Sequence, residues 1–179
     1  MCIVRNEGGT QEDFDILPSA TEEAYLRTYP EERAGHAFLS FCREGDLDAV
    51  IHMVKDLDDS DEPEGEDEAD ADGSGDEVLR YNGTFEGIEG TGLHVAVRYG
   101  REEVAWLLLA LASPLDWSKF PIDVLQAMER LGLSKDDRQP GVDIRAMKDS
   151  SSRTVNDLAK EIGGIWISWV SSERLDAGV

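Results

Sequence analysis

Apolar side chains recur at helical spacing along much of the chain, and glycine, proline and capping residues separate these stretches. Near the N-terminus, Ser19-Ala20-Thr21-Glu22 fits a capping box and predicts a short helix that ends at about Thr28. Two further helices are predicted at residues 31–43 and 47–55, because Gly45-Asp46 interrupts the periodic pattern between them.

The second half of the chain shows the same periodicity. Helices are predicted there at residues 91–99, 101–112, 121–131, 153–162 and 165–175. Gly100 separates the first two of these helices, and Pro114 ends the second. Residues 134–150 lack a periodic pattern and predict a loop. Asn82-Gly83 lies between apolar or β-branched neighbours and predicts a tight turn.

The negative charge of the chain is concentrated in one segment. Residues 56–77 contain 13 Asp and Glu and no Lys or Arg, and the formal net charge of all 179 residues is −22. Like charges repel and this segment has little to bury, so we expect a disordered acidic loop. Residues 1–17 are polar and irregular, which predicts a flexible tail. We therefore expect this tail and one domain at residues 18–179, interrupted by the acidic loop.

A recognisable pattern surrounds Gly100. Residues 91–99 (TGLHVAVRY) precede this glycine, and residues 101–109 (REEVAWLLL) follow it. The pattern closely resembles the ankyrin repeat, whose helix pair has the form TPLHxAAxxG followed by hxxVVxLLL. Gly92 stands where that family has proline, and Val97 stands where it has a second alanine. The resemblance implies two antiparallel helices, with a left-handed glycine at the end of the first.

Two weaker copies of this pattern flank the first. The best unit covers residues 90–116, and degenerate units lie around 34–56 and 153–175. Their anchor glycines are 55 and 63 residues apart, whereas the ankyrin period is about 33 residues. The first spacing equals one period plus the length of the acidic segment. The second spacing is close to two periods, which leaves room for a degenerate repeat at 120–144. We expect an all-α fold, a short ankyrin-repeat solenoid of about three to four helix-pair units with a disordered acidic insertion.

The resemblance also implies a binding surface. Ankyrin proteins usually bind partners along a concave face formed by the first helix of each pair and the hairpin before it. Carried onto this sequence, the candidate partner-binding residues are Val95, Arg98, Tyr99, Tyr81, Phe85, Arg43 and Glu44. The corresponding positions of the last unit are Leu158, Glu161 and Ile162. Tyrosine and arginine are enriched at binding hot spots.

No arrangement of residues indicates catalysis. His94 has a structural role in the ankyrin pattern, and Cys42 occupies a small core position, so we expect both side chains to be buried and inert. Trp166 and Trp169 are expected to pack on the array rather than to form an exposed patch. There is no recognisable catalytic triad, phosphate-binding loop or metal-ligand spacing, so we expect neither an enzyme nor a cofactor or metal site.

Composition narrows the possible partners. Nucleic acids and anionic membranes require clustered Lys and Arg, and neither is expected to bind so acidic a chain. With two cysteines and neither a signal peptide nor a membrane-spanning run recognisable, we expect a cytoplasmic or nuclear protein, working as a monomer. A basic protein is the natural charged partner.

Two functions remain open. The protein is either an escort or chaperone for a Lys/Arg-rich protein, or a scaffold or regulatory adaptor in which the acidic loop is only a spacer. The escort hypothesis assigns binding to an acidic arm on residues 56–77, whose members are Asp58, Asp59, Asp61, Glu62, Glu64, Glu66, Asp67, Glu68, Asp70, Asp72, Asp76 and Glu77. Long-range attraction by this arm would accelerate association and weaken with added salt.

Overall fold

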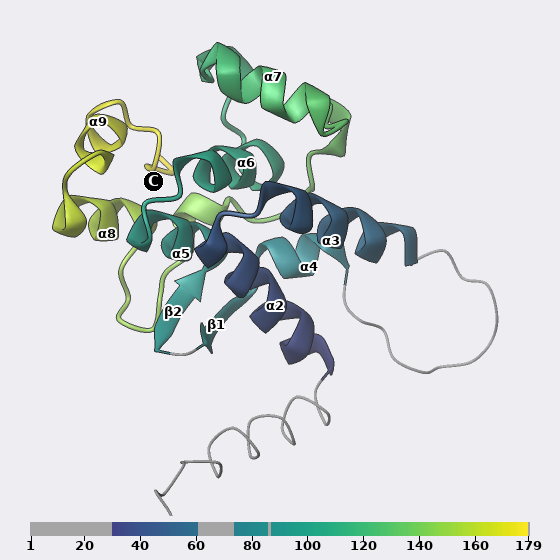
Figure 1. Ribbon diagram of the computed structural model, residues 1–179. Helices are drawn as coiled ribbons and strands as arrows, with labels where there is room; N and C mark the ends of the chain where they lie inside the picture. Colours follow the sequence, from purple (N-terminus) through teal and green to yellow (C-terminus); the bar gives the residue numbers. More distant parts are fainter. Residues whose placement is uncertain (1–29, 61–73, 86, 179) are drawn as a thin grey trace, which may run out of the picture.

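The computed structural model describes residues 30–60, 74–85 and 87–178 (Figure 1). Its α-helices are α2 (Pro30–Glu44), α3 (Leu47–Ser60), α4 (Gly75–Leu79), α5 (Gly92–Arg98), α6 (Glu102–Ala112), α7 (Ile122–Arg130), α8 (Val155–Ile162) and α9 (Trp166–Ser171). Three 3₁₀ turns, η1 (Trp117–Lys119), η2 (Lys135–Asp137) and η3 (Ile144–Ala146), lie in the connections. Two short strands, β1 (Asn82–Phe85) and β2 (Ile88–Thr91), form an antiparallel hairpin. The prediction of a mainly helical protein is confirmed, including a largely irregular segment at 134–150.

Three helix pairs form the body of the described structure. Helix α5 lies between α2 and α8, and it contacts both of them (Figure 1). Helix α3 packs against α2, α6 against α5, and α9 against α8. Helix α7 contacts α6 on its outer side. Because α5 and α8 are direct neighbours, residues 120–144 do not contribute a layer between them.

The core is centred on α6, whose residues from Val104 to Ala112 are all buried. The ring of Trp106 lies 4.7 Å from that of Phe120 and 4.5 Å from that of Trp169, measured between centroids. Trp166 lies 4.9 Å from Trp169 in an edge-to-face arrangement. The prediction that both C-terminal tryptophans are packed rather than exposed is therefore confirmed, and Trp169 fixes α9 against α6.

The predicted turn at Asn82-Gly83 is wrong. Asn82 pairs with Thr91 and Phe85 with Ile88, so both predicted turn residues lie inside β1. The register places the turn after Phe85, where Gly87 has φ of +77°, in the left-handed region that glycine favours.

The predicted disorder of residues 56–77 is wrong at both ends of the segment. Helix α3 continues to Ser60, because Leu57 is buried against the core. Ser74 is the N-cap of α4, and its hydroxyl accepts a hydrogen bond from the Glu77 amide at 3.3 Å. The Glu77 carboxylate accepts one in return from the Ser74 amide at 3.2 Å. The remainder, residues 61–73, lies outside the described residues, as do the predicted tail at 1–17 and the helix predicted to end at about Thr28.

Candidate protein-binding site

His94 joins two parts of the fold. Its ring is buried, and its Nδ1 atom accepts a hydrogen bond from the Thr91 amide at 3.3 Å and lies 2.9 Å from Thr91 Oγ1. Since Nδ1 accepts, Nε2 carries the proton and donates to the backbone oxygen of Arg153 at 3.1 Å. Burial lowers the pKa of His94 below its ordinary value, and the Arg153 carbonyl and the nearby Asp149 carboxylate oppose this effect only in part. The structural role expected for His94 is confirmed.

Cys42 is also a core residue, as predicted. Its side chain is fully buried, and this burial strongly raises the pKa of the thiol. Within the part of the chain that the structure describes, no three His, Cys, Asp or Glu side chains converge as a metal site would require.

Val95 does not belong to a binding surface. The structure places it fully in the core, and Leu158 of α8 is buried as well. For Val95 the physical reason is that α5 has a helix on each side, α2 and α8, and little of its surface is left to solvent. The prediction of a surface role is therefore corrected for both residues.

The remaining first-helix candidates lie at one edge of the helix stack. The hydrogen bond from Arg101 Nε to the Arg43 carbonyl (2.8 Å) brings together the C-terminal ends of α2 and α5. The His94–Arg153 contact brings together the N-terminal ends of α5 and α8. The three helices are thus parallel, and their C-terminal ends share an edge. Exposed residues at this edge are Glu44, Arg98, Tyr99, Glu161 and Ile162, and Arg43 beside them is half-buried.

Tyr81 has a structural contact that sequence reasoning did not anticipate. Its hydroxyl donates to the Glu32 carboxylate at the start of α2. Its ring covers Gly35 so closely that a Cβ atom at that position would overlap it. Tyr81 is half-buried and ties the hairpin base to α2. Phe85, the other hairpin candidate, is at the end of β1.

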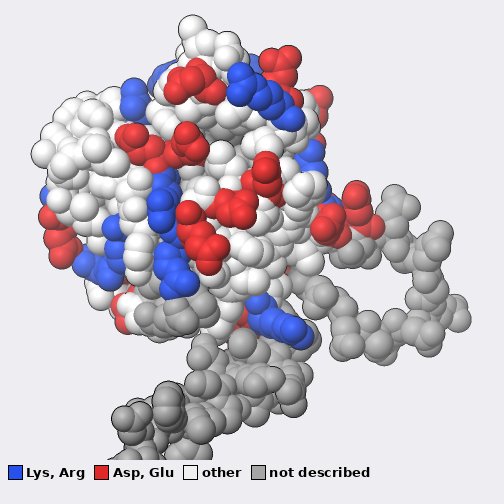
Figure 2. Space-filling model, in the orientation of Figure 1, with Lys and Arg blue, Asp and Glu red and all other residues white. Residues whose placement is uncertain are grey.

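The turn between α8 and α9 carries an uncharged surface. Residues 162–172 contain no Asp, Glu, Lys or Arg. The side chains of Ile165 and Ile167 are 50% and 59% exposed, and Tyr99 at the neighbouring end of α5 is 44% exposed. Figure 2 shows an uncharged lobe over α9, whereas acidic and basic side chains lie next to each other in the middle of the same face.

The acidic arm divides into fixed and exposed carboxylates. Asp58 accepts a hydrogen bond from the Gly75 amide at 3.1 Å, and this bond joins the end of α3 to the start of α4. Asp58 also accepts a hydrogen bond from the side chain of Gln139. Asp76 pairs with Arg80, and Glu77 is part of the α4 cap. Asp59 is exposed. The acids outside the described residues are Asp61, Glu62, Glu64, Glu66, Asp67, Glu68, Asp70 and Asp72.

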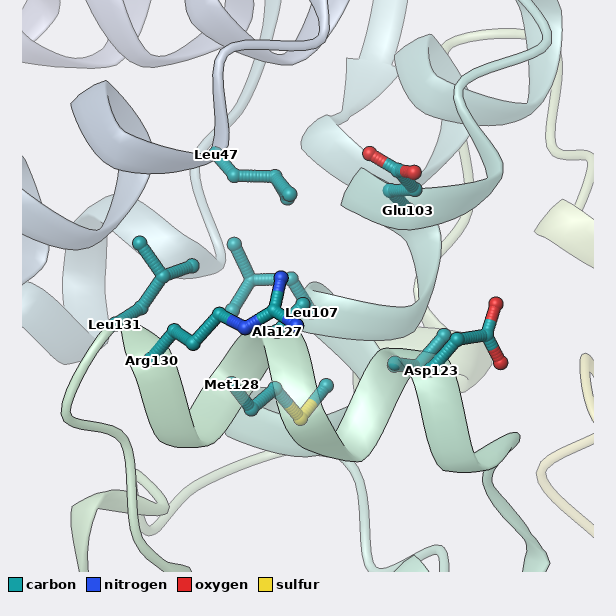
Figure 3. A pocket seen from close by; sticks show the side chains of 9 residues that line it. Leu47, Glu103, Leu107, Asp123, Ala127, Met128, Arg130 and Leu131 are labelled. Carbon is teal, nitrogen blue, oxygen red and sulfur yellow. The ribbon is translucent and has the colours of Figure 1, made fainter.

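A groove separates α7 from the beginnings of α3 and α6 (Figure 3). Its volume is about 210 Å³. The apolar part of its wall consists of Leu47, Leu107, Val124, Ala127, Met128 and Leu131. Glu103 and Asp123 lie at its rim, together with Arg130 (Figure 3). No pattern in the sequence predicted this groove, since its walls come from three separate helices.

Comparison with protein-family models, curated proteins and solved structures gave no match. Among the described residues, no helix is both long enough and apolar enough to cross a bilayer.

Proposed function

We propose that this protein is a non-catalytic protein-binding module, built as a short ankyrin-type array, that escorts a basic, Lys/Arg-rich protein. Support for the array comes from the stacked pairs α2–α3, α5–α6 and α8–α9, and from the hairpin that precedes α5. The Thr91–His94 contact at the start of α5 is the one that the family pattern implies. The proposed setting is the cytoplasm or nucleus, and the module acts as a monomer without a cofactor.

The escort function rests on one observation, the way in which the acidic segment is attached. Residues 61–73 contain eight acids and no base. The residues on either side are held in place by the Asp58–Gly75 hydrogen bond and by the buried side chains of Leu57 and Val78. The negative charge of residues 61–73 is thus joined at both ends to residues that the fold holds in place. Such a charge attracts basic partners over a Debye length of about 8–10 Å.

The attachment also determines which variant tests the function. Deletion of residues 57–77 would remove Leu57, Asp58 and the α4 cap, and it would damage the fold. Replacing the eight acids of 61–72 by Asn and Gln keeps every described contact. We expect the intact protein to retain basic proteins from a cell lysate at low salt, and the amide variant to lose them. Retention of the same basic proteins by the amide variant would contradict the escort function.

A regulatory adaptor is the alternative, and the exposed edge with Arg98 and Tyr99 favours it. In that case the double variant Arg98→Ala/Tyr99→Ala should lose its partners while the amide variant keeps them. Lys160→Ala is the control, because Lys160 is exposed on the neighbouring α8 and is not one of the candidate binding residues.

A further inference from the structure

The inference concerns the groove beside α7 and deepens the proposed function, on which it rests. Helix α7 is incompletely packed: Met128 is its buried residue, and Val124, Ala127 and Leu131 remain partly exposed along the groove. An apolar cavity of about 150 Å³ holds a benzene molecule, and the volume of this groove is about 210 Å³. This is room for one large apolar side chain and too little for a typical small-molecule ligand.

The charges around the groove indicate what accompanies that side chain. Glu103 on α6 and Asp123 on α7 are exposed at its rim. A shallower hollow of about 370 Å³ shares Leu47, Ala127, Arg130 and Leu131 with the groove and adds Asp46 and Asp48. Four carboxylates therefore surround an apolar floor, against the single guanidinium of Arg130. An apolar anchor with basic neighbours is complementary to this arrangement.

We propose that this groove binds an extended segment of the basic partner, with one leucine-sized or phenylalanine-sized side chain in the cavity and adjacent Lys or Arg facing the carboxylates. The acidic arm attracts the partner by long-range charge, whereas the groove recognises a particular short sequence. The side chain of Arg130 lies over the wall of the groove that α7 forms (Figure 3). Its positive charge repels the Lys or Arg of the bound segment and so weakens binding.

The test uses two fluorescein-labelled pentapeptides, with either leucine or serine at the centre and two lysines on each side. Their affinities for the full-length protein are measured by fluorescence anisotropy. We expect the leucine peptide to bind about tenfold more tightly, because the serine peptide lacks the apolar side chain that fills the cavity. Ala127→Phe should fill the groove and abolish this preference. Gln126→Phe places the same ring on the exposed side of α7 and should leave the preference intact.

Charge variants test the rim independently. Glu103→Lys/Asp123→Lys should weaken the leucine peptide about tenfold. Glu129→Lys/Asp136→Lys makes the same change in net charge at exposed positions outside the groove and should have a smaller effect. Arg130→Gln should strengthen binding. Equal effects of the two double reversals would overturn the proposed site, because binding would then depend on net charge alone.

The same peptides separate this inference from the proposed function. In the variant with amides at the eight acids of 61–72, both peptides should bind more weakly, but the ratio of their affinities should persist. If this variant keeps the ratio of affinities and also captures basic proteins as well as the intact protein does, the result supports the groove and contradicts a role of the acidic arm. Absence of a leucine preference in the intact protein overturns the groove. A dimer in sedimentation that Ala127→Phe dissociates also overturns it, because a second copy would be the occupant.

Discussion

Replacement of His94 by alanine should lower the free energy of unfolding by more than the loss of a single hydrogen bond would. The change leaves the buried Thr91 amide and hydroxyl without their imidazole partner, whereas the Arg153 carbonyl keeps a hydrogen bond from the Asp149 amide. Each abandoned buried polar group costs about 1–3 kcal/mol. The combined loss in the free energy of unfolding is therefore about 3 kcal/mol. In a chain of this size, that loss lowers Tm by roughly 6–12 °C.

Thermal and urea unfolding followed by circular dichroism at 222 nm measure this loss. His52→Ala is the matched control, because His52 is exposed on α3 and its removal should change stability by less than about 0.5 kcal/mol. Equal stability of the two variants would refute the reasoning, since it would mean that the contacts between β2, α5 and the segment before α8 contribute nothing.

The pH dependence provides a second measurement on the same residue. Burial lowers the pKa of His94 in the folded protein, so the unfolded chain binds a proton more readily at this position. The His94 contribution to stability is then present above the unfolded pKa of about 6.5 and is lost as pH falls through and below it. Between pH 7.5 and 5.5 the wild-type protein should lose stability on acidification, with a slope of at most about 1.4 kcal/mol per pH unit from this group. His94→Ala should lack that component, and an unchanged slope would contradict the assignment.

Three further predictions concern the core and its ion pairs. Gly92→Ala should cost about 1–3 kcal/mol in urea unfolding, because the added Cβ would lie 2.6 Å from a ring carbon of Phe38; stability equal to wild type would contradict this. In a Cys2→Ser background, Cys42 should resist a thiol reagent in the folded protein and react fully in urea, and rapid labelling without urea would refute its burial. Although burial raises the pKa of Asp149, hydrogen bonds and charge from its ion pair lower it overall. Its stabilisation should therefore be present above about pH 3.9 and lost as pH falls further, and Asp149→Asn should flatten acid unfolding followed by fluorescence.

Local sequence signals were sufficient where helix ends are marked by short-range chemistry. Gly100 has φ of +70° and ends α5 as predicted, and the periodic residues of 101–112 form a buried helix. The hairpin turn was misplaced because Asn82-Gly83 is a strong turn signal, whereas the register is set by the pairing of whole strands. The cap at Ser74 had a visible signal, Ser-x-x-Glu before an apolar pair, but the surrounding acids favoured a prediction of disorder.

Tertiary structure alone decided which residues reach solvent. Val95 is a first-helix position in the ankyrin pattern, but it is buried in a helix that lies between α2 and α8. Asp58 belongs to a run of acids, and the return of the chain to Gly75 makes it a structural acceptor. The groove requires Leu47, Glu103 and Ala127 to meet although they are far apart in sequence. Periodicity and capping determine helices because they act within a few residues, whereas burial and grooves depend on which helices become neighbours, and contacts over long sequence distances set that arrangement.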